Sequence, residues 1–302
     1  MSWRKVVPRE RGRILLRIAE ALQARAEEMA RTIALETGNA LRTQARGEAN
    51  LTADIFRYFG GLASELKGET VPLGENVLSY KRREPLGVVG AIIPWNAPVM
   101  LGALKIAPAL CAGNTIVCKP SEFTSVSLLE LACLAEEAGL PPGVFNVVTG
   151  FGGEVGEPLV RHPKVARVAF TGGDEGGRRV NLAAADCFKR VSLELGGKSP
   201  HIIFDDADME KAANGVITGI FSAGGQTCMA GSRLLLQESI HDEFVERLLK
   251  IVRAAKVGDP ADASTEVGPV ATRPQFEKVM SYIDIAKKEG ARCIAGGRAL
   301  TG

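Results

Sequence analysis

A single cysteine in a glycine-rich loop is the side chain of this sequence best suited to covalent chemistry. Cys228 lies in the segment GGQTCMAG, between an expected helix and an expected strand. A thiol has an ordinary pKa of about 8.5 and is a strong nucleophile once it is deprotonated. Small neighbours would let a substrate approach the sulfur closely. The alternative interpretation is a buried core cysteine, the commoner fate of this residue type, although a core position needs no such flexible loop.

Two further residues could assist a nucleophile. Glu194, in LELGGKSP, stands between two leucines, and partial desolvation would raise its pKa and suit it to act as a general base. Alternatively, it is a strand-edge carboxylate paired with Lys198. Asn96, in PWNAP, follows an apolar strand and precedes a helix, so its amide could donate to a developing oxyanion. An asparagine at that place serves equally well as a helix N-cap.

Two turns at the ends of expected strands have the residue types of a nucleotide site. Lys119 and Glu122 could grip ribose hydroxyls, and the Glu122 charge would repel a 2′-phosphate and favour NAD over NADP. The alternative is a solvated turn with a helix cap. The segment FTGG (170–173) precedes a helix, where backbone N–H groups could face a pyrophosphate. The usual G-x-G-x-x-G pattern is absent, since GFGGEV (150–155) ends in valine, so a conventional Rossmann grip is not assumed.

Alternating strands and helices are expected to position these residues. From residue 87 onward, short apolar runs alternate with helical stretches, which is typical of a parallel sheet covered on both faces. Strands are expected at residues 77–83 (on a hairpin), 87–93, 115–119, 144–148, 168–170, 201–204, 233–237 and 292–295. Helices are expected at 9–37, 43–66, 99–112, 125–138, 153–161, 174–185, 208–222, 241–255 and 273–289. The predicted fold class is α/β, with a domain boundary near residue 196.

The composition excludes several classes of protein. Hydrophobic residues make up 46% of the 302 residues and charged residues 24%, which are values of a globular protein of one large or two ordinary domains. The formal net charge of +2 argues against a nucleic-acid binder. No apolar run approaches the roughly 20 residues of a membrane helix, and no signal peptide opens the chain. Six cysteines without a C-x-x-C pair predict neither a metal site nor a disulfide scaffold, and reduced thiols in the cytoplasm are the simplest expectation.

Five motifs in order resemble the NAD(P)-dependent aldehyde dehydrogenase superfamily. They are PWNAP (94–98), KPSE (119–122), FTGG (170–173), LELGGKSP (193–200) and GGQTCMAGSR (224–233), and weaker similarity runs from Trp3 to Gly297. The resemblance implies that the thiolate of Cys228 attacks an aldehyde to form a thiohemiacetal, while Asn96 and the Cys228 N–H hold the oxyanion. Hydride transfer to the nicotinamide then leaves a thioester, which water activated by Glu194 hydrolyses to the acid.

The resemblance also implies a set of contacts to NAD, with NADP the less favoured cofactor. The residues that match the family's cofactor contacts are Trp95, Lys119, Ser121, Glu122, Gly152, Gly156, Thr171, Gly172, Gly173 and Leu195. Lys105 matches a lysine near the catalytic centre and could belong to a proton relay. The implied fold is a Rossmann-like cofactor domain (1–196) with helices on both sheet faces, a bridging hairpin (67–85) and a partial α/β catalytic domain (197–302). Such a hairpin usually supports homodimers or homotetramers.

The sequence departs from the family pattern in its extent. Nothing in it corresponds to the family's C-terminal part, which normally supplies an E-x-F-G-P-like segment that holds the nicotinamide ribose. The chain is therefore expected to be part of a longer polypeptide, to receive the rest from a partner, or to turn over weakly. Two other functions stay open: an NAD-binding or assembly module, and a cofactor-independent thiol hydrolase that uses Cys228 and Glu194. Coenzyme A as acyl acceptor and the identity of the aldehyde are also open.

Overall fold

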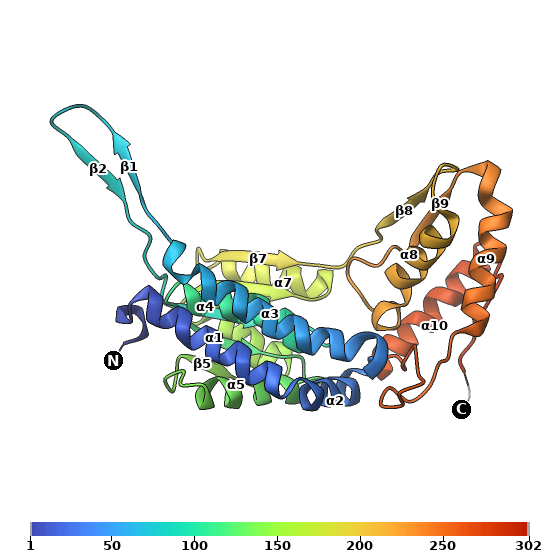
Figure 1. Cartoon of the computed structure of the whole chain (residues 1–302), viewed down its shortest axis with the longest axis horizontal. Coiled ribbons are helices and arrows are strands. Elements are labelled where there is room, and N and C mark those ends of the chain that lie inside the picture. The colour runs from blue at the N-terminus through green and yellow to red at the C-terminus, as the bar shows by residue number, and fades with distance from the viewer. Residues whose placement is uncertain (1, 301–302) are drawn as a thin grey trace. The chain divides into compact units, whose positions relative to one another are not determined.

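The computed structural model describes residues 2–300 and divides into two compact units (Figure 1). Unit 1 comprises the chain as far as Ile33 together with Arg46–Leu195. Unit 2 comprises Ala34–Ala45 together with the chain from Gly196 onward. The division thus falls one residue before the one expected from the sequence. The membership of Ala34–Ala45 in unit 2 has no counterpart in the sequence-based division.

A five-stranded parallel sheet forms the centre of unit 1, in the order β5-β4-β3-β6-β7. Its strands are β3 (Val88–Ile92), β4 (Thr115–Lys119), β5 (Phe145–Val147), β6 (Val165–Thr171) and β7 (Arg190–Glu194). The strand order reverses between β3 and β6, so right-handed crossovers place helices on both faces of the sheet. The expected α/β class is confirmed. Strand β7 is not among the expected strands, because its charged, half-exposed pattern is that of a sheet edge.

The helices of unit 1 follow the predicted series with one correction. They are α1 (Pro8–Ala24), α2 (Ala26–Thr37, which continues into unit 2), α3 (Arg46–Leu62), α4 (Pro98–Cys111), α5 (Val126–Glu137), α6 (Glu157–Arg161) and α7 (Asp174–Ala185). The single helix expected at residues 9–37 is wrong. The chain leaves helical geometry at Arg25, whose φ of −110° and ψ of 22° separate α1 from α2. The apolar periodicity continues across this break, which is why the sequence pattern does not reveal it.

A tightly packed core joins β6 to α6 and α7. It contains Val160, Val165, Val168, Phe170, Val180, Ala183 and Ala184. Burial of each large apolar side chain of this kind stabilises the fold by about 1.5–3 kcal/mol. Strand β6 and the second half of α7 are therefore packed firmly together, which restricts the turn that joins them.

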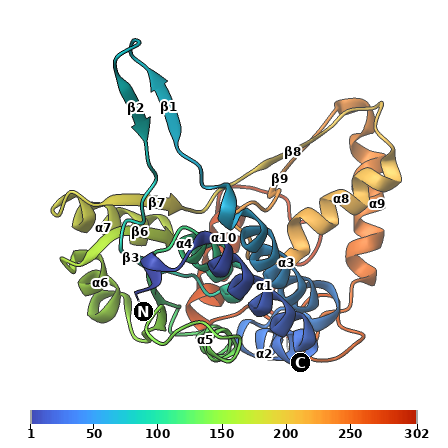
Figure 2. The same cartoon turned by 60° about the vertical axis from the view of Figure 1, so that its left-hand side comes forward.

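A two-stranded antiparallel hairpin leaves the sheet region of unit 1 between α3 and β3 (Figures 1 and 2). Its strands are β1 (Glu69–Pro72) and β2 (Leu78–Lys81). The strand expected at residues 77–83 is confirmed as β2. Leu73, Val77, Leu78 and Tyr80 are all exposed. An isolated hairpin of this kind is only marginally stable in water, because few of its apolar groups are buried.

Unit 2 is built on the parallel pair β8 (Pro200–Ile203) and β9 (Arg233–Leu236). Its helices are α8 (Met209–Phe221), α9 (His241–Ala254) and α10 (Arg273–Lys288). The strand expected at residues 292–295 is wrong, since these described residues are exposed and form no regular structure. A strand needs a neighbour to pair its backbone groups, and an apolar pattern alone does not supply one. Among the described residues, no helix is long and apolar enough for a membrane crossing.

Candidate active site

The carboxyl ends of the parallel strands of unit 1 bring several of the predicted residues to one edge of the sheet. Lys119 ends β4, Thr171 ends β6 and Glu194 ends β7, while Asn96 follows β3. Thr171 and Glu194 are direct neighbours in the β6–β7 register, and the Gly172 N–H donates to the Glu194 carbonyl oxygen at 3.1 Å. This edge is where open α/β sheets bind their ligands.

Lys105 joins this edge from helix α4. Its Nζ donates to Thr171 Oγ1 at 2.5 Å and lies 3.5 Å from the Leu101 carbonyl oxygen. Burial lowers the pKa of Lys105, and the electrostatic interaction with Glu194, followed by a smaller one with the thiol of Cys118, opposes that shift. Lys105 is thus a half-buried amine within electrostatic reach of Glu194. The structure brings together three of the predicted residues in this way.

The Glu194 carboxylate does not occupy the environment expected from its neighbours in sequence. Glu194 is exposed, whereas Leu193 and Leu195 are half-buried. The expected desolvation is therefore wrong, because alternation along β7 turns the leucines inward and the carboxylate outward. Lys198, the alternative partner, donates instead to the Gly197 carbonyl oxygen at 3.3 Å.

An ion pair between a buried lysine and an exposed glutamate closes the turn after β4. Lys119 is only 3% exposed, so the alternative of a solvated turn is wrong for this residue. Its Nζ donates to the Pro120 carbonyl oxygen at 2.9 Å and to Glu122 Oε2 at 3.3 Å. The hydroxyl oxygen of Ser121, also buried, accepts from the Phe123 N–H at 3.4 Å. The two charges expected to grip a ribose are thus paired with each other and held at the sheet edge.

A cavity of about 180 Å³ lies at the reversal of strand order between β3 and β6. Its lining includes Ile92 and Phe170 at the ends of these strands, the turn Gly152–Gly156, and one face of α7. A Cβ atom on Gly156 would lie 3.8 Å from Lys119 Cδ, so the cavity adjoins the buried side chain of Lys119. The helix expected at residues 153–161 begins here as a wider turn, followed by α6. The sequence analysis missed Ile92, Phe170, Arg179 and Val180 in this wall, although 176, 179, 180 and 183 share one helical face.

The turn from β6 into α7 contains two glycines in different surroundings. A Cβ atom on Gly172 would lie 2.6 Å from the ring of Phe170, so this glycine is required by packing. Gly173 is the N-cap of α7 and has open space where a side chain would stand. Gly173, unlike Gly172, therefore leaves room for a ligand at the helix N-terminus.

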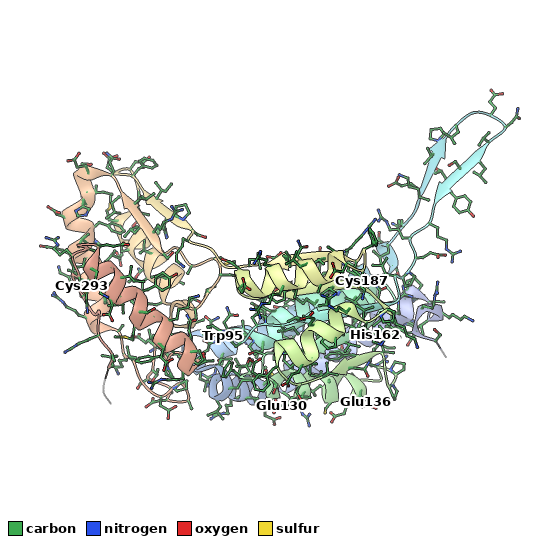
Figure 3. All side chains as sticks on the ribbon, turned by 180° about the vertical axis from the view of Figure 1, so that it is seen from behind. Trp95, Glu130, Glu136, His162, Cys187 and Cys293 are labelled. Carbon is green, nitrogen blue, oxygen red and sulfur yellow. The ribbon has the colours of Figure 1, made fainter. Side chains whose placement is uncertain are left out.

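Asn96 is not the N-cap of helix α4. The N-cap is Ala97, and Glu48 of α3 supplies an acceptor to the first turn. Its Oε1 accepts from the Val99 and Met100 N–H groups at 3.2 and 3.3 Å. The capping alternative for Asn96 is thus wrong. Trp95 (labelled in Figure 3) and Asn96 form a half-buried turn directly before the helix start that Glu48 anchors. Glu48 was missed by the sequence analysis. The signal available in the sequence was a glutamate on the apolar face of an amphipathic helix, next to Ala49 and in line with Thr52.

Cys228 lies in unit 2 on an exposed loop, so its interpretation as a core cysteine is wrong. The loop is entered through three residues with positive φ, Ala223, Gly224 and Gly225. Thr227 Oγ1 donates to the Ser222 carbonyl oxygen at 3.2 Å, and the Ala230 N–H donates to the Thr227 carbonyl oxygen at 3.1 Å. These bonds hold the backbone on both sides of an open thiol.

A cavity of about 400 Å³ in unit 2 reaches the neighbours of this thiol. Thr227 and Met229 are in its lining, together with His201 of β8 and Gly219 of α8. The other five cysteines are free thiols as well, and Cys187 of unit 1 and Cys293 of unit 2 are exposed (Figure 3). No group of three or more His, Cys, Asp or Glu side chains in residues 2–300 is arranged to hold a metal ion.

The chain matches one protein family over its whole length, the aldehyde dehydrogenase family, at residues 1–302. It is 43% identical over 302 residues to (Z)-2-((N-methylformamido)methylene)-5-hydroxybutyrolactone dehydrogenase of Acinetobacter baylyi, with 100% of the chain and 62% of the relative covered. It is 46% identical over 296 residues to betaine aldehyde dehydrogenase of Mesorhizobium japonicum, with 98% and 60% covered.

Solved structures agree with these relatives. The NAD+ complex of an aldehyde dehydrogenase from Bacillus cereus superimposes with a TM-score of 0.97 at 41% identity, covering 100% of the chain and 62% of that structure. An NAD-dependent aldehyde dehydrogenase from Sinorhizobium meliloti gives 0.97 at 44% identity, covering 99% and 60%. The chain thus spans about 60% of the length of the proteins it matches. By its sequence and its fold, the chain belongs to the aldehyde dehydrogenase family.

Proposed function

We propose that this chain contributes the cofactor site and the nucleophile of an enzyme that oxidises an aldehyde to a carboxylic acid with NAD. The observation that carries the proposal is the exposed thiol of Cys228 on a loop whose backbone is hydrogen-bonded on both sides. A nucleophile of this kind must be both open to a substrate and fixed in direction. Membership of the aldehyde dehydrogenase family and the NAD+ complex of the Bacillus cereus relative support the proposal of an NAD-dependent aldehyde oxidation.

The residues of unit 1 fit a dinucleotide. The cavity at the strand reversal, bounded by Gly152 and Gly156, would take the adenine side. The ion pair of Lys119 and Glu122, with Ser121 beside it, would face the adenosine ribose. The charge of Glu122 would oppose a 2′-phosphate, which favours NAD over NADP.

The start of α7 would receive the pyrophosphate. Gly173 leaves space there, and the positive end of the helix dipole favours an anion. Thr171 and Gly172 shape this turn from the strand side. Trp95 and Leu195 would border the nicotinamide. The side chain of Leu195 packs directly against Gly177 of α7, where a Cβ atom would lie 2.5 Å from Leu195 Cδ2. When bound, the cofactor supplies a hydride acceptor.

The protein's own residues would divide the remaining work. The thiolate of Cys228 attacks the carbonyl carbon, and the Asn96 amide and the Cys228 N–H donate to the resulting oxyanion. Loss of hydride from that adduct leaves a thioester on Cys228. Glu194, exposed at the end of β7, accepts a proton from the water that attacks the thioester. Lys105, bonded to Thr171 and near Glu194, could return protons to solvent.

We further propose that the protein forms homodimers or homotetramers through hairpin β1–β2 and works in the cytoplasm. The hairpin exposes Leu78 and Tyr80, which are 82% and 67% accessible, and such apolar groups favour contact with another chain. Six free cysteines are consistent with a reducing compartment. Sedimentation of the wild type beside a Leu78→Asp/Tyr80→Asp variant tests the assembly. An unchanged mass would reject the hairpin as the contact.

The test of the proposed reaction combines NAD+ binding by calorimetry with NADH absorbance in the presence of several aldehydes. The wild type should bind NAD+ and form NADH, and Cys228→Ser should bind NAD+ but form none. Glu194→Gln should release about one NADH per chain and then stop, because the thioester accumulates. Absence of both NAD+ binding and NADH would overturn the proposal. NAD+ binding without turnover would support a binding module instead, and ester cleavage that needs neither NAD+ nor Glu122 would support a thiol hydrolase.

A further inference from the structure

A cavity of about 730 Å³ in unit 1 is lined by residues 4–8 and Arg11 on one side and by residues at the root of the hairpin on the other. Its wall contains six cationic residues, which are Arg4, Lys5, Arg11, Lys81, Arg82 and Arg83. Glu84 is the single acidic residue in the same wall. The concentration of one charge sign in a concave surface raises the local positive potential and attracts anions. None of these residues belongs to the proposed cofactor site.

Arg11 is a buried charge without an acidic partner. It is only 6% exposed, and its Nε and Nη1 donate to the carbonyl oxygens of Cys111 at 3.0 Å and Val6 at 2.6 Å. Among the described residues, no carboxylate lies within salt-bridge distance of its guanidinium. Carbonyl groups orient a guanidinium but do not neutralise it, and burial lowers the pKa of Arg11. A buried cation in a protein is usually paired, so an anion in the cavity would complete this site.

Within the described part of the chain, the other cations of the cavity wall are either unpaired or held only in exposed ion pairs, so they can interact with a bound anion. Within residues 2–300, Arg4 and Lys5 form no ion pair. Lys81 pairs with Glu69 at 3.1 Å and Arg82 pairs with Glu84 at 3.7 Å. Both of these pairs are largely exposed, and exposed pairs contribute little and exchange readily with other anions.

Helix α1 adds to the same field. Val7 and Pro8 line the cavity where the helix begins, and no side chain caps that end. The helix is 17 residues long, and the positive end of its dipole favours an anion there. Glu10 in the first turn offsets part of this field and itself pairs with Arg13 at 3.2 Å. The cavity therefore favours an anionic ligand, because it combines the buried guanidinium of Arg11, several exposed cations and the start of helix α1.

We propose that this cavity binds a small multivalent oxyanion of the diphosphate type. A diphosphate carries several negative charges within a few ångströms, which suits cations that come from two separate segments of chain. Guanidinium groups bind phosphate oxygens in paired hydrogen bonds, and Arg4, Arg82 and Arg83 supply three of them to the cavity wall. The Nε of Arg83 donates to the Lys67 carbonyl oxygen at 3.2 Å, which orients this guanidinium at the root of the hairpin. The source of the diphosphate is either the free anion or a nucleotide.

Trp3 provides a local reporter for the test. It is buried next to Arg4, and its Nε1 donates to the Leu110 carbonyl oxygen at 3.2 Å. The chain has 2 tryptophans, so Trp95→Phe leaves Trp3 as the sole indole. Titration of this variant with pyrophosphate at constant ionic strength should give a saturable change in fluorescence. A parallel titration with ADP identifies the source: saturation by both probes indicates that a nucleotide can reach the cavity, and saturation by pyrophosphate alone indicates the free anion.

Charge removal decides whether the response is specific. Arg4→Gln/Lys5→Gln in the Trp95→Phe background should weaken pyrophosphate binding by about tenfold or more, since each charged hydrogen bond carries roughly a decade of affinity. Arg82→Gln/Arg83→Gln should do the same from the hairpin side. The matched control is Lys250→Gln/Arg253→Gln on α9, which removes the same charge elsewhere and should change binding less than about twofold. A linear response without saturation, or an equal loss in the control, would overturn the proposal.

Discussion

Gly197 lies against the backbone of Cys228, and a Cβ atom added to it would stand 3.2 Å from the Cys228 carbonyl oxygen. The LELGGKSP segment therefore contributes more than the carboxylate of Glu194. Its second glycine leaves the space in which the peptide of Cys228, the proposed nucleophile, lies. This contact links two sequence motifs within unit 2.

The first prediction concerns this contact. Gly197→Ala should displace the Cys228 peptide by a few tenths of an ångström, and since a misplacement of about 1 Å can cost roughly a hundredfold, aldehyde-dependent NADH formation should fall severalfold. The number of reactive thiols should stay the same. Gly215→Ala on α8, where a Cβ meets open space, is the control and should keep full activity. Equal rates in both variants would show that the contact has no influence on the nucleophile.

The second prediction separates packing from binding at the start of α7. Gly172→Ala should lower the free energy of unfolding by about 1–3 kcal/mol, because the new methyl group overlaps the Phe170 ring. Gly173→Ala should change it by less than about 0.5 kcal/mol, since the site is open and its φ of −75° suits any residue. Urea denaturation measures both. If Gly173→Ala also leaves NAD+ affinity unchanged in calorimetry, the pyrophosphate does not approach this residue.

The third prediction is a dependence of stability on pH. Burial lowers the pKa of Lys105 from its usual value of 10.5, so between the two pKa values the unfolded chain binds more protons than the folded one. The contribution of Lys105 to stability therefore rises with pH in that interval, and its penalty is complete below the folded-state pKa. Relative to wild type, Lys105→Met should be favoured most near neutral pH, and this advantage should shrink as the pH approaches 10.5. Urea denaturation at several pH values measures the difference, and a constant difference would contradict the assignment.

The fourth prediction addresses a strained surface residue. Phe188 has a φ of 51° and is 99% exposed, so it gains no packing energy from this unfavourable geometry. Phe188→Gly should raise the free energy of unfolding by about 0.5 kcal/mol, because the left-handed conformation costs other residues roughly 1–2 kcal/mol while glycine loses somewhat more entropy on folding. Thermal denaturation measures the gain. Phe188→Ala is the control, since alanine has the same restriction, and a similar gain in both would point to removal of the aromatic ring instead.

Local pattern was sufficient for most elements of this fold but not for their interruptions. Apolar strands such as β3 and β4 are recognisable because both faces of a parallel sheet are buried. The break at Arg25 cannot be recognised in the same way, because the apolar period of the helix continues across it. The edge strand β7 cannot be recognised either, because its half-exposed residues form no clear apolar run. Residues 292–295 show the opposite error, because their sequence pattern predicts a strand although no described neighbour pairs with it.

Periodicity and short motifs are local properties of the chain, and they were sufficient to predict the α/β class, the family and the candidate site residues. The surroundings of those residues could be learned only from the folded chain. The tertiary structure paired Lys119 with Glu122, joined Lys105 to Thr171, placed Glu48 under the turn of Asn96 and left Arg11 without an acidic partner. These outcomes depend on burial and on contacts between residues far apart in sequence, and energies of that kind arise only when separate elements pack together.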